Sequence, residues 1–429
     1  MTNINVLVLG SGGREHALSW KIAQSERLGK LFCMPGNPGT AAIAENIAGS
    51  ATDFAKVKEV VLQNKIDMVV VGPEEPLVKG ICDLFAADEQ LKGVMFIGPD
   101  KLGATLEGSK DFAKEFMVKN GVPTARYQSF GKGDEAKALE FMKGLTPPYV
   151  LKADGLAAGK GVLIIDDLDE AVAALDEMFS GKFGDAGNTV VIEQFLKGIE
   201  ASCFVLTDGK DYLLLPEAKD YKRIGEGDKG LNTGGMGAVS PVPFYTEEFK
   251  SKVEERIVKP TIKGLAEIGA RYCGFIFIGL MNCDGDPYVI EYNVRMGDPE
   301  TEAVMTRIDS DFLGHLAAAA KGELASEKIV YSPKCALTCV QVSGGYPEGY
   351  AKGYEIDGLE DVKDAIVFHA GTSDKGGKVV TSGGRVLAVT ALGENIPQTR
   401  EKLYGEVAKI SYRDKYFRGD IGLDVMKYL

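Results

Sequence analysis

The chain has 429 residues, with 49 Lys or Arg against 62 Asp or Glu, so its formal net charge is −13. An acidic surface repels polyanions, which argues against a general nucleic-acid or anionic-membrane binder. Hydrophobic residues make up 45% and charged residues 26% of the chain, as in ordinary globular proteins, and the length suffices for about three domains.

Targeting and metal signals are sparse. The N-terminus shows no secretory signal, and no apolar run approaches the ~18 residues of a membrane helix. The seven cysteines include no C-x-x-C pair, and the three histidines are too scattered for a histidine zinc site. These features predict a cytoplasmic protein with reduced thiols.

The first hundred residues alternate between buried strands and helical segments. Strands are predicted over 5–9, 67–71 and 94–97, each ending in glycine, and a helix over 15–24. Uniformly apolar strands separated by helices indicate a doubly wound parallel sheet covered on both faces. In such a sheet the ligand crevice lies beyond the carboxyl ends of the strands.

The middle of the chain has a different texture. A helix over 110–120 is closed by Gly121 and Pro123. The next predicted elements are strands 149–152 and 162–165, joined by the glycine-rich link 153–161, then helix 167–179, strand 189–193 and a hairpin of 201–207 with 212–215.

Residues 220–237 are polar, glycine-rich and without periodicity, which predicts a long functional or disordered loop. A helix over 247–268 and paired strands 274–282 and 288–292 follow. After about residue 328 the chain becomes strand-rich, with strands predicted at 336–342, 365–368, 377–381 and 386–390 and a helix at 398–410.

The segment Gly10-Ser11-Gly12-Gly13-Arg14-Glu15 follows a strand and opens a helix, where backbone N–H groups bind anions. A dinucleotide fingerprint requires glycine where Glu15 stands. The segment therefore favours a phosphate or a phosphorylated substrate over a nicotinamide cofactor. The alternative is that its glycines only let helix and strand pack.

Residues 152–161 resemble a P-loop but fail its spacing, and Gly161 stands where Ser or Thr should coordinate magnesium. We therefore expect a flexible glycine-rich hairpin over a nucleotide, with Lys152 reaching the phosphates. A lysine in an apolar strand is costly to bury without an anion. The alternative is that Lys152 faces solvent at the strand end.

Glu291 and Asn293 lie two apart on a predicted strand and so face the same side. Their oxygens are hard ligands suited to Mg²⁺, which takes few protein ligands plus water and phosphates. Arg295 could meet developing negative charge, and Asp298 and Glu300 add carboxylates. The alternative is a solvated strand end.

Together these motifs resemble the ATP-grasp ligases, and most closely the phosphoribosylamine–glycine ligase (glycinamide ribonucleotide synthetase) family. The resemblance spans nearly the whole chain and rests on GSGGREHAL at 10–18, PGNPGT at 35–40, GPEEPLVKGI at 72–81, SKDFAKEFM at 109–117, PYVLKADGLAAGKGV at 148–162, LNTGGMGAVSP at 231–241, EYNVRMGDPETE at 291–302, SGGYP at 343–347, HAGT at 369–372 and GGRVL at 383–387. One departure is Tyr221, where many members carry histidine.

The resemblance implies a multidomain α/β and α+β architecture. An N-terminal doubly wound parallel α/β domain, 1–105, would hold the substrate. An ATP-grasp core, 106–328, would carry a mobile lid over about 124–197, and a β-rich C-terminal domain, 329–429, would pack against the site.

The resemblance also implies the reaction: ATP-dependent joining of glycine to 5-phosphoribosylamine through glycyl phosphate, giving glycinamide ribonucleotide, ADP and phosphate in purine biosynthesis. It implies a monomer whose partners are small molecules, with no nucleic acid and no membrane. The cofactors would be ATP and Mg²⁺ or Mn²⁺.

Site residues are carried over on the matching motifs. ATP phosphates would meet Lys110 and Lys152, adenine would meet Glu193 and the chain near Leu196, and ribose would meet Glu200. The metal would be held by Glu291 and Asn293. The catalytic set would be Arg295, Lys152 and Asp220. Phosphoribosylamine would be bound by Gly12, Gly13, Arg14, Glu15, Asn37, Thr40, Glu74, Glu75 and Asp298.

Three rival interpretations stay open from the sequence. The first is another ATP-grasp carboxylate ligase of purine precursor metabolism. The second is a nicotinamide-dependent oxidoreductase, which Glu15 disfavours. The third is a non-catalytic nucleotide-sensing protein that kept the fold.

Overall fold

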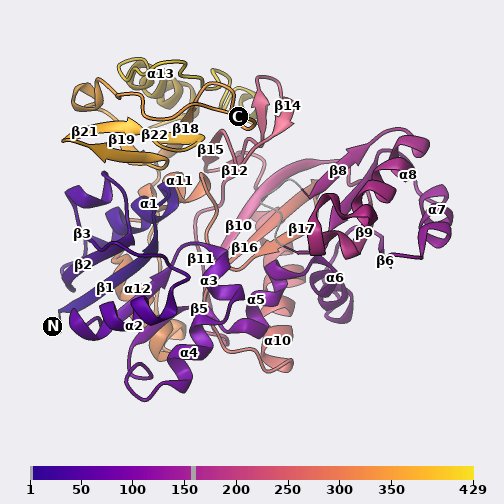
Figure 1. Cartoon of the computed structure of the whole chain (residues 1–429), viewed down its shortest axis with the longest axis horizontal. Helices are drawn as coiled ribbons and strands as arrows, with labels where there is room; N and C mark the ends of the chain where they lie inside the picture. The colour runs from indigo at the N-terminus through magenta and orange to yellow at the C-terminus, as the bar shows by residue number, and fades with distance from the viewer. Residues whose placement is uncertain (1–2, 156–160) are drawn as a thin grey trace.

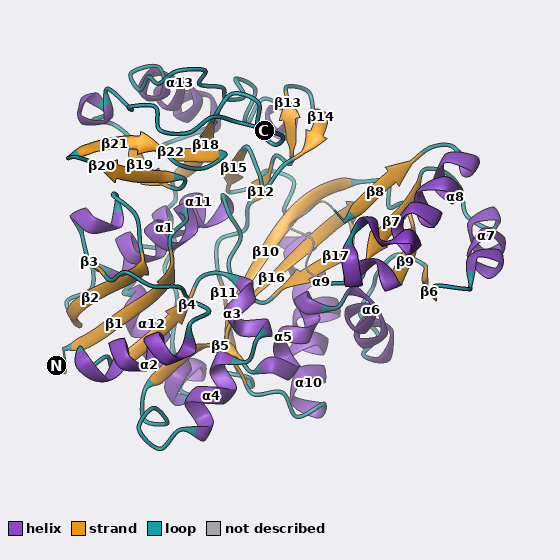
Figure 2. Ribbon diagram, viewed as in Figure 1, coloured by secondary structure: helices purple, strands orange, loops and turns teal. Residues whose placement is uncertain are grey.

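The computed structural model describes residues 3–155 and 161–429. Its strands form a large sheet, a small sheet projecting to one side and a third sheet across the top (Figure 1, Figure 2). Most of the glycine-rich link expected over 153–161 lies outside the described residues. Within the described ranges no helix is long and apolar enough to cross a membrane.

The large sheet begins with five parallel strands in the order β3-β2-β1-β4-β5. They are β1 Ile4–Gly10, β2 Leu28–Pro35, β3 Glu45–Asn46, β4 Met68–Val71 and β5 Met95–Pro99. The predicted doubly wound parallel sheet is confirmed. The prediction named strands over 5–9, 67–71 and 94–97 but missed β2 and β3.

Successive residues of β1 enter different cores because strand side chains alternate between faces. Val6 and Val8 pack in one cluster, with α1 Gly13–Ile22 and α12 Phe312–Lys321. Leu7 and Leu9 pack in the other, which is covered by α2 Phe54–Gln63, α3 Glu74–Val78, α4 Ile81–Ala87 and α5 Lys101–Gly108.

The same sheet continues beyond the first hundred residues. Strand β5 pairs antiparallel with β16 Tyr272–Cys283, and β16 pairs in turn with β10 Ile199–Thr207 and β17 Asp286–Asn293. Strand β11 Tyr212–Leu214 completes it. Backbone hydrogen bonds therefore connect the N-terminal parallel strands to β17, the strand that carries Glu291 and Asn293.

The β16–β17 hairpin turns at Asp284 and Gly285, whose φ angles are +52° and +89°. This left-handed pair is the turn that an Asp-Gly sequence favours. Farther along, Gly279 pairs with Glu291 but Leu280 pairs with Val289, so Ile290 is an extra residue in a β-bulge.

Beyond the bulge, side chains of β17 alternate in direction. The Tyr292 ring is buried, and its hydroxyl lies 2.6 Å from Thr261 Oγ1 on α10 Lys259–Glu267. Glu291 and Asn293 therefore face the opposite side, away from α10.

The small sheet has the antiparallel order β6-β9-β7-β8, from β6 Tyr127–Gly131, β7 Tyr149–Ala153, β8 Val162–Ile165 and β9 Thr189–Gln194. Its apolar residues share a core with α7 Glu135–Lys143 and α8 Leu168–Glu177. A π-helical turn, Met178–Lys182, extends α8. This unit projects from the rest of the molecule (Figure 1).

The third sheet has the order β12-β15-β18-β22-β19. Its strands are β12 Lys219–Asp220, β15 Gly237–Ser240, β18 Cys335–Val342, β19 Ile366–His369 and β22 Arg385–Gly393. Helix α13 Ile396–Val407 packs on it, and a hairpin of β20 Thr372–Lys375 and β21 Lys378–Thr381 lies beside it. Two of its strands come from the middle of the chain, so it joins the C-terminal region to the core.

The prediction that 220–237 lacks regular structure is wrong. Besides β12 and β15, this segment forms an antiparallel hairpin of β13 Arg223–Gly225 and β14 Lys229–Asn232. All four residues of β14 are exposed, so neither face is buried and the sequence carries no alternation to detect.

Three helical features complete the core. The helix expected over 247–268 is α9 Glu247–Val253, a π-helical turn Glu254–Val258 and α10. Helix α6 Lys110–Lys119 begins at Ser109, whose Oγ accepts from Phe112 N at 3.1 Å. Helix α11 Glu300–Thr306 is buried along its whole length.

Tyr221 lies in the core of the C-terminal region. Its side chain is 2% exposed, and its hydroxyl donates to Asp424 Oδ1 at 2.5 Å and accepts from Gly422 N at 2.9 Å. Lys219 Nζ stands 3.8 Å from the ring centroid and Arg418 Cζ 5.1 Å. Tyr221 therefore anchors the chain between two cations.

We expect Tyr221→Phe to lower the free energy of unfolding by about 1–2 kcal/mol, because Asp424 and the Gly422 amide both lose a partner. Chemical denaturation measures the change. The control is Tyr350→Phe, at a half-buried position in the same C-terminal region. Equal stability of the two variants would contradict the anchoring role.

Candidate active site

The candidate metal ligands end strand β17. The carboxylate charge of Glu291 reaches three lysines: it helps to raise the pKa of Lys222 and partly offsets the lowering of the pKa of Lys110 and Lys114 by burial. The Glu291 carboxylate thus lies near three lysines, two on α6 and one that follows β12.

The residues present suit a Mg²⁺ or Mn²⁺ ion. Asn293 is 9% exposed, and within the described residues its buried Nδ2 has no hydrogen-bond partner, so this amide is not tied to the protein through Nδ2 and its Oδ1 can turn to a ligand. No group of three or more His, Cys, Asp or Glu among the described residues is arranged to hold a metal. One carboxylate and one amide, completed by phosphates and water, is the donor set that Mg²⁺ accepts.

A buried ion triad lies beside these ligands, comprising Lys114, Lys152 and Glu193. Lys152 Nζ is 2.8 Å from Glu193 Oε1, and Lys114 Nζ is 2.9 Å from Glu193 Oε2. The three side chains are 2–6% exposed. Glu193 is buried, which by itself would raise its pKa, but the two ammonium groups lower it, so the carboxylate stays ionised.

Lys110 stands at the first turn of α6. Its backbone N donates to Asp154 Oδ1 at 2.6 Å, and its Nζ donates to Gly155 O at 2.9 Å. The helix N-terminus is therefore attached to the strand end that follows Lys152. Burial lowers the pKa of Lys110.

Glu200 and Asp220 share Lys222. Lys222 Nζ pairs with Glu200 Oε2 and lies 3.4 Å from Asp220 Oδ1. Burial raises the pKa of Asp220, whereas Lys222 lowers the pKa of Glu200 against its burial. Leu196, predicted to lie near adenine, is half-buried in the connection that follows β9.

Arg295 bridges two segments. Its Nη2 lies 2.7 Å from Glu107 Oε1, and its Nε lies 3.3 Å from Glu74 Oε2. Both Arg295 Nη1 and Arg14 Nη1 donate to Met296 O at 3.3 Å. Arg295 thus stands between the metal strand and the first turn of α1, which carries Arg14.

Glu15, in the first turn of α1, folds its side chain back over the N-terminus of the helix. Its carboxylate accepts from Gly12 N at 2.6 Å and from Arg14 Nε at 2.6 Å. A Cβ at Gly10 or Gly72 would lie 2.4 or 2.1 Å from Glu15 atoms. These glycines make room for the Glu15 side chain.

Asn37 and Thr40 form a closed local network. Asn37 Nδ2 donates to Ser11 O at 2.9 Å and to His369 O at 2.8 Å, and Asn37 Oδ1 accepts from Thr40 N at 2.9 Å. His369 N in turn donates to His16 Nδ1 at 2.9 Å. Both residues therefore lie where the first domain meets β19.

Among the other predicted substrate residues, Asp298 lies inside the same junction and Glu75 outside it. Asp298 Oδ2 accepts from Arg14 N at 3.5 Å, and Asp298 Oδ1 pairs with Arg385 Nη1 at 3.1 Å. Arg385 also donates to Gly234 O at 2.6 Å. Glu75, in contrast, is exposed and pairs with Lys79.

Helix α11 places two acids beneath this junction. Ser202 Oγ donates to Glu300 Oε1 at 3.3 Å. Glu302 is fully buried, its two carboxyl oxygens find no hydrogen-bond partner among the described residues, and a Cβ at Gly13 would lie 2.3 Å from its Oε1. Gly13 therefore allows the approach of Glu302.

Sequence reasoning missed Lys114, Lys222, Glu107 and Arg385. Lys114 follows Lys110 by one helical turn, so the spacing was available, but a lysine in a polar helix is ordinarily on its solvated face. Arg385 lies in the GGR motif, whose partner Asp298 is 87 residues away in sequence. No local pattern reveals such pairs.

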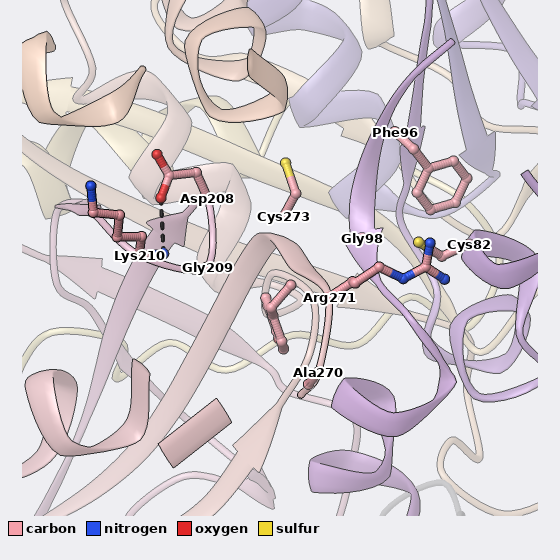
Figure 3. Close-up of a pocket in the computed structure, with 10 residues that line it drawn as sticks. Cys82, Phe96, Gly98, Asp208, Gly209, Lys210, Ala270, Arg271 and Cys273 are labelled. Carbon is pink, nitrogen blue, oxygen red and sulfur yellow. Dashed lines mark hydrogen bonds between the residues drawn. The ribbon is translucent and has the colours of Figure 1, made fainter. Parts of the chain in front are cut away.

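A pocket of about 360 Å³ opens elsewhere, where β5 meets β16. Figure 3 shows Arg271, Cys82 and Phe96 on one side, Asp208 and Lys210 on the other, and Cys273 between them. None of the predicted site residues lines it.

Comparisons with known proteins cover the whole chain. Residues 4–107, 108–301 and 336–424 match the N domain, the ATP-grasp (A) domain and the C domain of phosphoribosylglycinamide synthetase. The chain is 46% identical to the phosphoribosylamine–glycine ligases of Caldanaerobacter subterraneus subsp. tengcongensis (97% of this chain, 99% of the relative) and Escherichia coli O157:H7 (98% of each).

Solved structures agree. The phosphoribosylamine–glycine ligase of Thermotoga maritima superposes with a TM-score of 0.85 at 36% identity, covering 97% of this chain and all of that one. The biotin carboxylase domain of Hydrogenobacter thermophilus 2-oxoglutarate carboxylase, crystallised with MgADP, gives 0.73 at 18% identity, covering 100% of this chain and 94% of that one. The second likeness shows the fold alone.

We expect Glu300→Gln to change the pH dependence of stability. Burial and the nearby Asp220 charge raise the pKa of Glu300 from 4.5 to about 7. Between these values the folded state binds more protons than the unfolded state, so this group destabilises the fold as pH rises. The gain in Tm of Glu300→Gln over the parent should be near zero at pH 4.5 and largest above pH 7.

Thermal unfolding between pH 4.5 and 8 measures this gain. The matched control is Glu323→Gln, at an exposed position. A Tm difference for Glu300→Gln that is constant across the range would show that protonation of Glu300 is not linked to folding.

Proposed function

The chain belongs to the phosphoribosylglycinamide synthetase family, and we propose how its own residues carry out the family's reaction. It is an ATP-dependent carbon–nitrogen ligase that joins glycine to 5-phosphoribosylamine, giving glycinamide ribonucleotide, ADP and phosphate in purine biosynthesis.

The chemical problem is the leaving group. A carboxylate oxygen does not depart when an amine attacks, whereas phosphate departs readily from glycyl phosphate. The route we propose therefore transfers the γ-phosphoryl group of ATP to glycine first, and the amine of phosphoribosylamine then attacks the carbonyl carbon. Phosphoryl transfer depends mainly on positioning and on neutralising charge.

Two lysines and two metal ligands meet these needs in the proposal. Lys110 and Lys152 bind the ATP phosphates, and Glu291 and Asn293 hold Mg²⁺ or Mn²⁺ against them. The bound metal would neutralise the phosphate oxygens as charge shifts to ADP. Support comes from the single orientation of both ligands on β17, whose side-chain oxygens are the hard donors that Mg²⁺ prefers.

The nucleoside is placed along the chain between β9 and β10. Glu193 and the backbone near Leu196 would meet adenine, and Glu200 would meet the ribose hydroxyls. Supporting this, Glu193 is a buried carboxylate whose Oε1 lies 2.8 Å from Lys152 Nζ. An oxygen of this kind can accept from an amino group of a base.

Arg295 and Asp220 are the proposed catalytic side chains besides Lys152. Arg295 would steady the glycyl phosphate and the tetrahedral species that follows it. Its ion pair with Glu74 supports a position between the two substrates. Burial raises the pKa of Asp220, which suits a group that exchanges a proton during attack by the amine.

Phosphoribosylamine is placed in the first-domain junction. The residues we assign to its pocket are Gly12, Gly13, Arg14, Glu15, Asn37, Thr40, Glu74, Glu75 and Asp298. Arg14 and Arg295 donating to the same carbonyl, that of Met296, supports adjacency of this pocket and the metal strand. Closure of the small sheet, as a lid over about 124–197, would exclude water from the acyl phosphate.

We also propose that the protein acts as a monomer in the cytoplasm. Its seven cysteines are free thiols, which supports a reducing compartment.

One observation carries the assignment: Glu291 and Asn293 end a strand whose preceding carbonyl, Ile290 O, already accepts from Lys152 at 3.3 Å. The test is coupled ADP release with glycine and freshly generated phosphoribosylamine, each omitted in turn. Formate and bicarbonate, offered in place of glycine, test a different ATP-grasp carboxylate ligase. ADP release that needs both true substrates supports the proposal, and equal turnover with formate or bicarbonate overturns it.

We expect Glu291→Ala to reduce glycine-dependent ADP release by at least about a hundredfold while the fold is kept, because one metal ligand is lost. Steady-state kinetics at saturating Mg²⁺ measure the loss, and circular dichroism checks the fold. Unchanged turnover would remove Glu291 from the metal site.

We expect Lys152→Met to raise the KM for ATP about tenfold and to lower kcat, because a charge-assisted contact with the phosphates is lost. Kinetics on the folded fraction separate the two effects. Normal kinetics with lowered stability alone would mean that Lys152 only supports the strand.

A further inference from the structure

Lys114 is a buried cation that the mechanism above does not use. It projects from α6 one turn after Lys110, and its side chain is 2% exposed. Its Nζ lies 2.9 Å from Glu193 Oε2 and donates to Thr124 Oγ1 at 2.7 Å. Burying an ammonium group costs free energy unless a counter-charge compensates it, and Glu193 is that counter-charge for Lys114.

The contacts of Lys114 and Lys152 form a ring that runs from Glu193 to β17 and back. Thr124 Oγ1 donates to Val289 O at 2.8 Å, and Lys152 Nζ donates to Ile290 O at 3.3 Å. These carbonyls are consecutive on β17, immediately before Glu291. Starting from Glu193, the ring therefore reaches the metal strand by both lysines.

The charges in this ring do not balance. Glu193 supplies one negative charge, and Lys114 and Lys152 supply two positive charges. While Lys152 Nζ lies 2.8 Å from Glu193 Oε1, that carboxylate already compensates its positive charge, which weakens its attraction for a phosphate. If Lys114 were absent, departure of Lys152 would leave Glu193 as an uncompensated buried carboxylate.

We propose that Lys114 is a positioning residue that acts as the permanent counter-ion of Glu193, so that Lys152 can leave Glu193 and turn to the nucleotide phosphates. The Lys152–Glu193 pair is then the resting contact of the empty cleft. The Lys114–Glu193 pair persists in the occupied cleft and holds the Glu193 carboxylate in place. This inference rests on the proposed contact of Lys152 with the phosphates.

Affinity for the nucleotide should therefore depend on the charge of Lys114, because only charged Lys114 compensates Glu193 when Lys152 leaves. Burial lowers the pKa of Lys114 to about 8. The groups that face it are Glu193, Lys152 and Glu291, with the Tyr127 ring centroid 5.6 Å from its Nζ. When Lys114 loses its proton, Glu193 keeps Lys152, so affinity for the nucleotide should fall as pH rises through about 8.

The experiment measures the Kd of MgADP by isothermal titration calorimetry between pH 6.5 and 9 for the full chain and its variants. Lys114→Met should weaken binding about tenfold at pH 7 and remove the loss of affinity near pH 8. Lys114→Arg should keep the affinity at pH 7 and hold it up to pH 9, since arginine stays charged. The control is Lys119→Met, exposed on the same helix, which should match the parent.

A second pair of variants covers a folding defect in Lys114→Met. The double variant Lys114→Met with Glu193→Gln has no buried Glu193 carboxylate left to compensate, and its Kd should lie within about twofold of that of Glu193→Gln alone. A much weaker double variant would show that Lys114 acts on the nucleotide by itself, which overturns the proposal. So would a Lys114→Met protein with lowered Tm but parental Kd and pH profile.

The variant Lys152→Met distinguishes the role of Lys114 from the proposed contact of Lys152 with the phosphates. Weak MgADP binding by Lys152→Met, together with parental binding by Lys114→Met, refutes the role of Lys114 only. Parental binding by Lys152→Met refutes the contact of Lys152 with the phosphates.

Discussion

A single buried carboxylate shared by two ammonium groups organises the cleft. Glu193 on β9, Lys152 on β7 and Lys114 on α6 come from three elements and are each almost fully buried. Charges removed from water are tolerated only when they are paired and hydrogen-bonded. The triad therefore connects the small sheet to α6, and taken by itself it carries one surplus positive charge. A polyphosphate is the ligand that such a surplus suits.

Backbone pairing then relates this cleft to the second substrate. Strand β5 of the parallel sheet pairs with β16, and β16 pairs with β17, so the metal strand and β1, which leads to Arg14 at the start of α1, belong to one hydrogen-bonded sheet. Arg295 spans the remaining gap by its ion pairs with Glu74 and Glu107. Two reacting molecules can thus be held at a set separation by a rigid element, which is how enzymes gain from proximity.

Local signals predicted much of this molecule. Apolar runs ending in glycine revealed β1, β4 and β5, and the Asp284-Gly285 turn revealed the β16–β17 hairpin with Glu291 and Asn293 on one side. The features that the sequence could not reveal depend on distant partners. In the sequence, Lys114 looks like an ordinary solvent-exposed helix residue, and its burial follows from the ion pair with Glu193. Arg385 pairs with Asp298, which is distant in the sequence, because the third sheet brings the two residues together. Strand β14, exposed throughout, has no buried face to produce a pattern.

The central event is the exchange of partners at Lys152, which leaves Glu193 and binds the nucleotide phosphates. A crystal structure of the full chain with Mg²⁺ and a non-hydrolysable ATP analogue tests it directly. We predict that Lys152 Nζ contacts phosphate oxygens and has left Glu193, while Lys114 still pairs with Glu193. The contrary result is a bound analogue whose phosphates lie away from β7, with Lys152 still on Glu193 and with Glu291 and Asn293 turned from the phosphates.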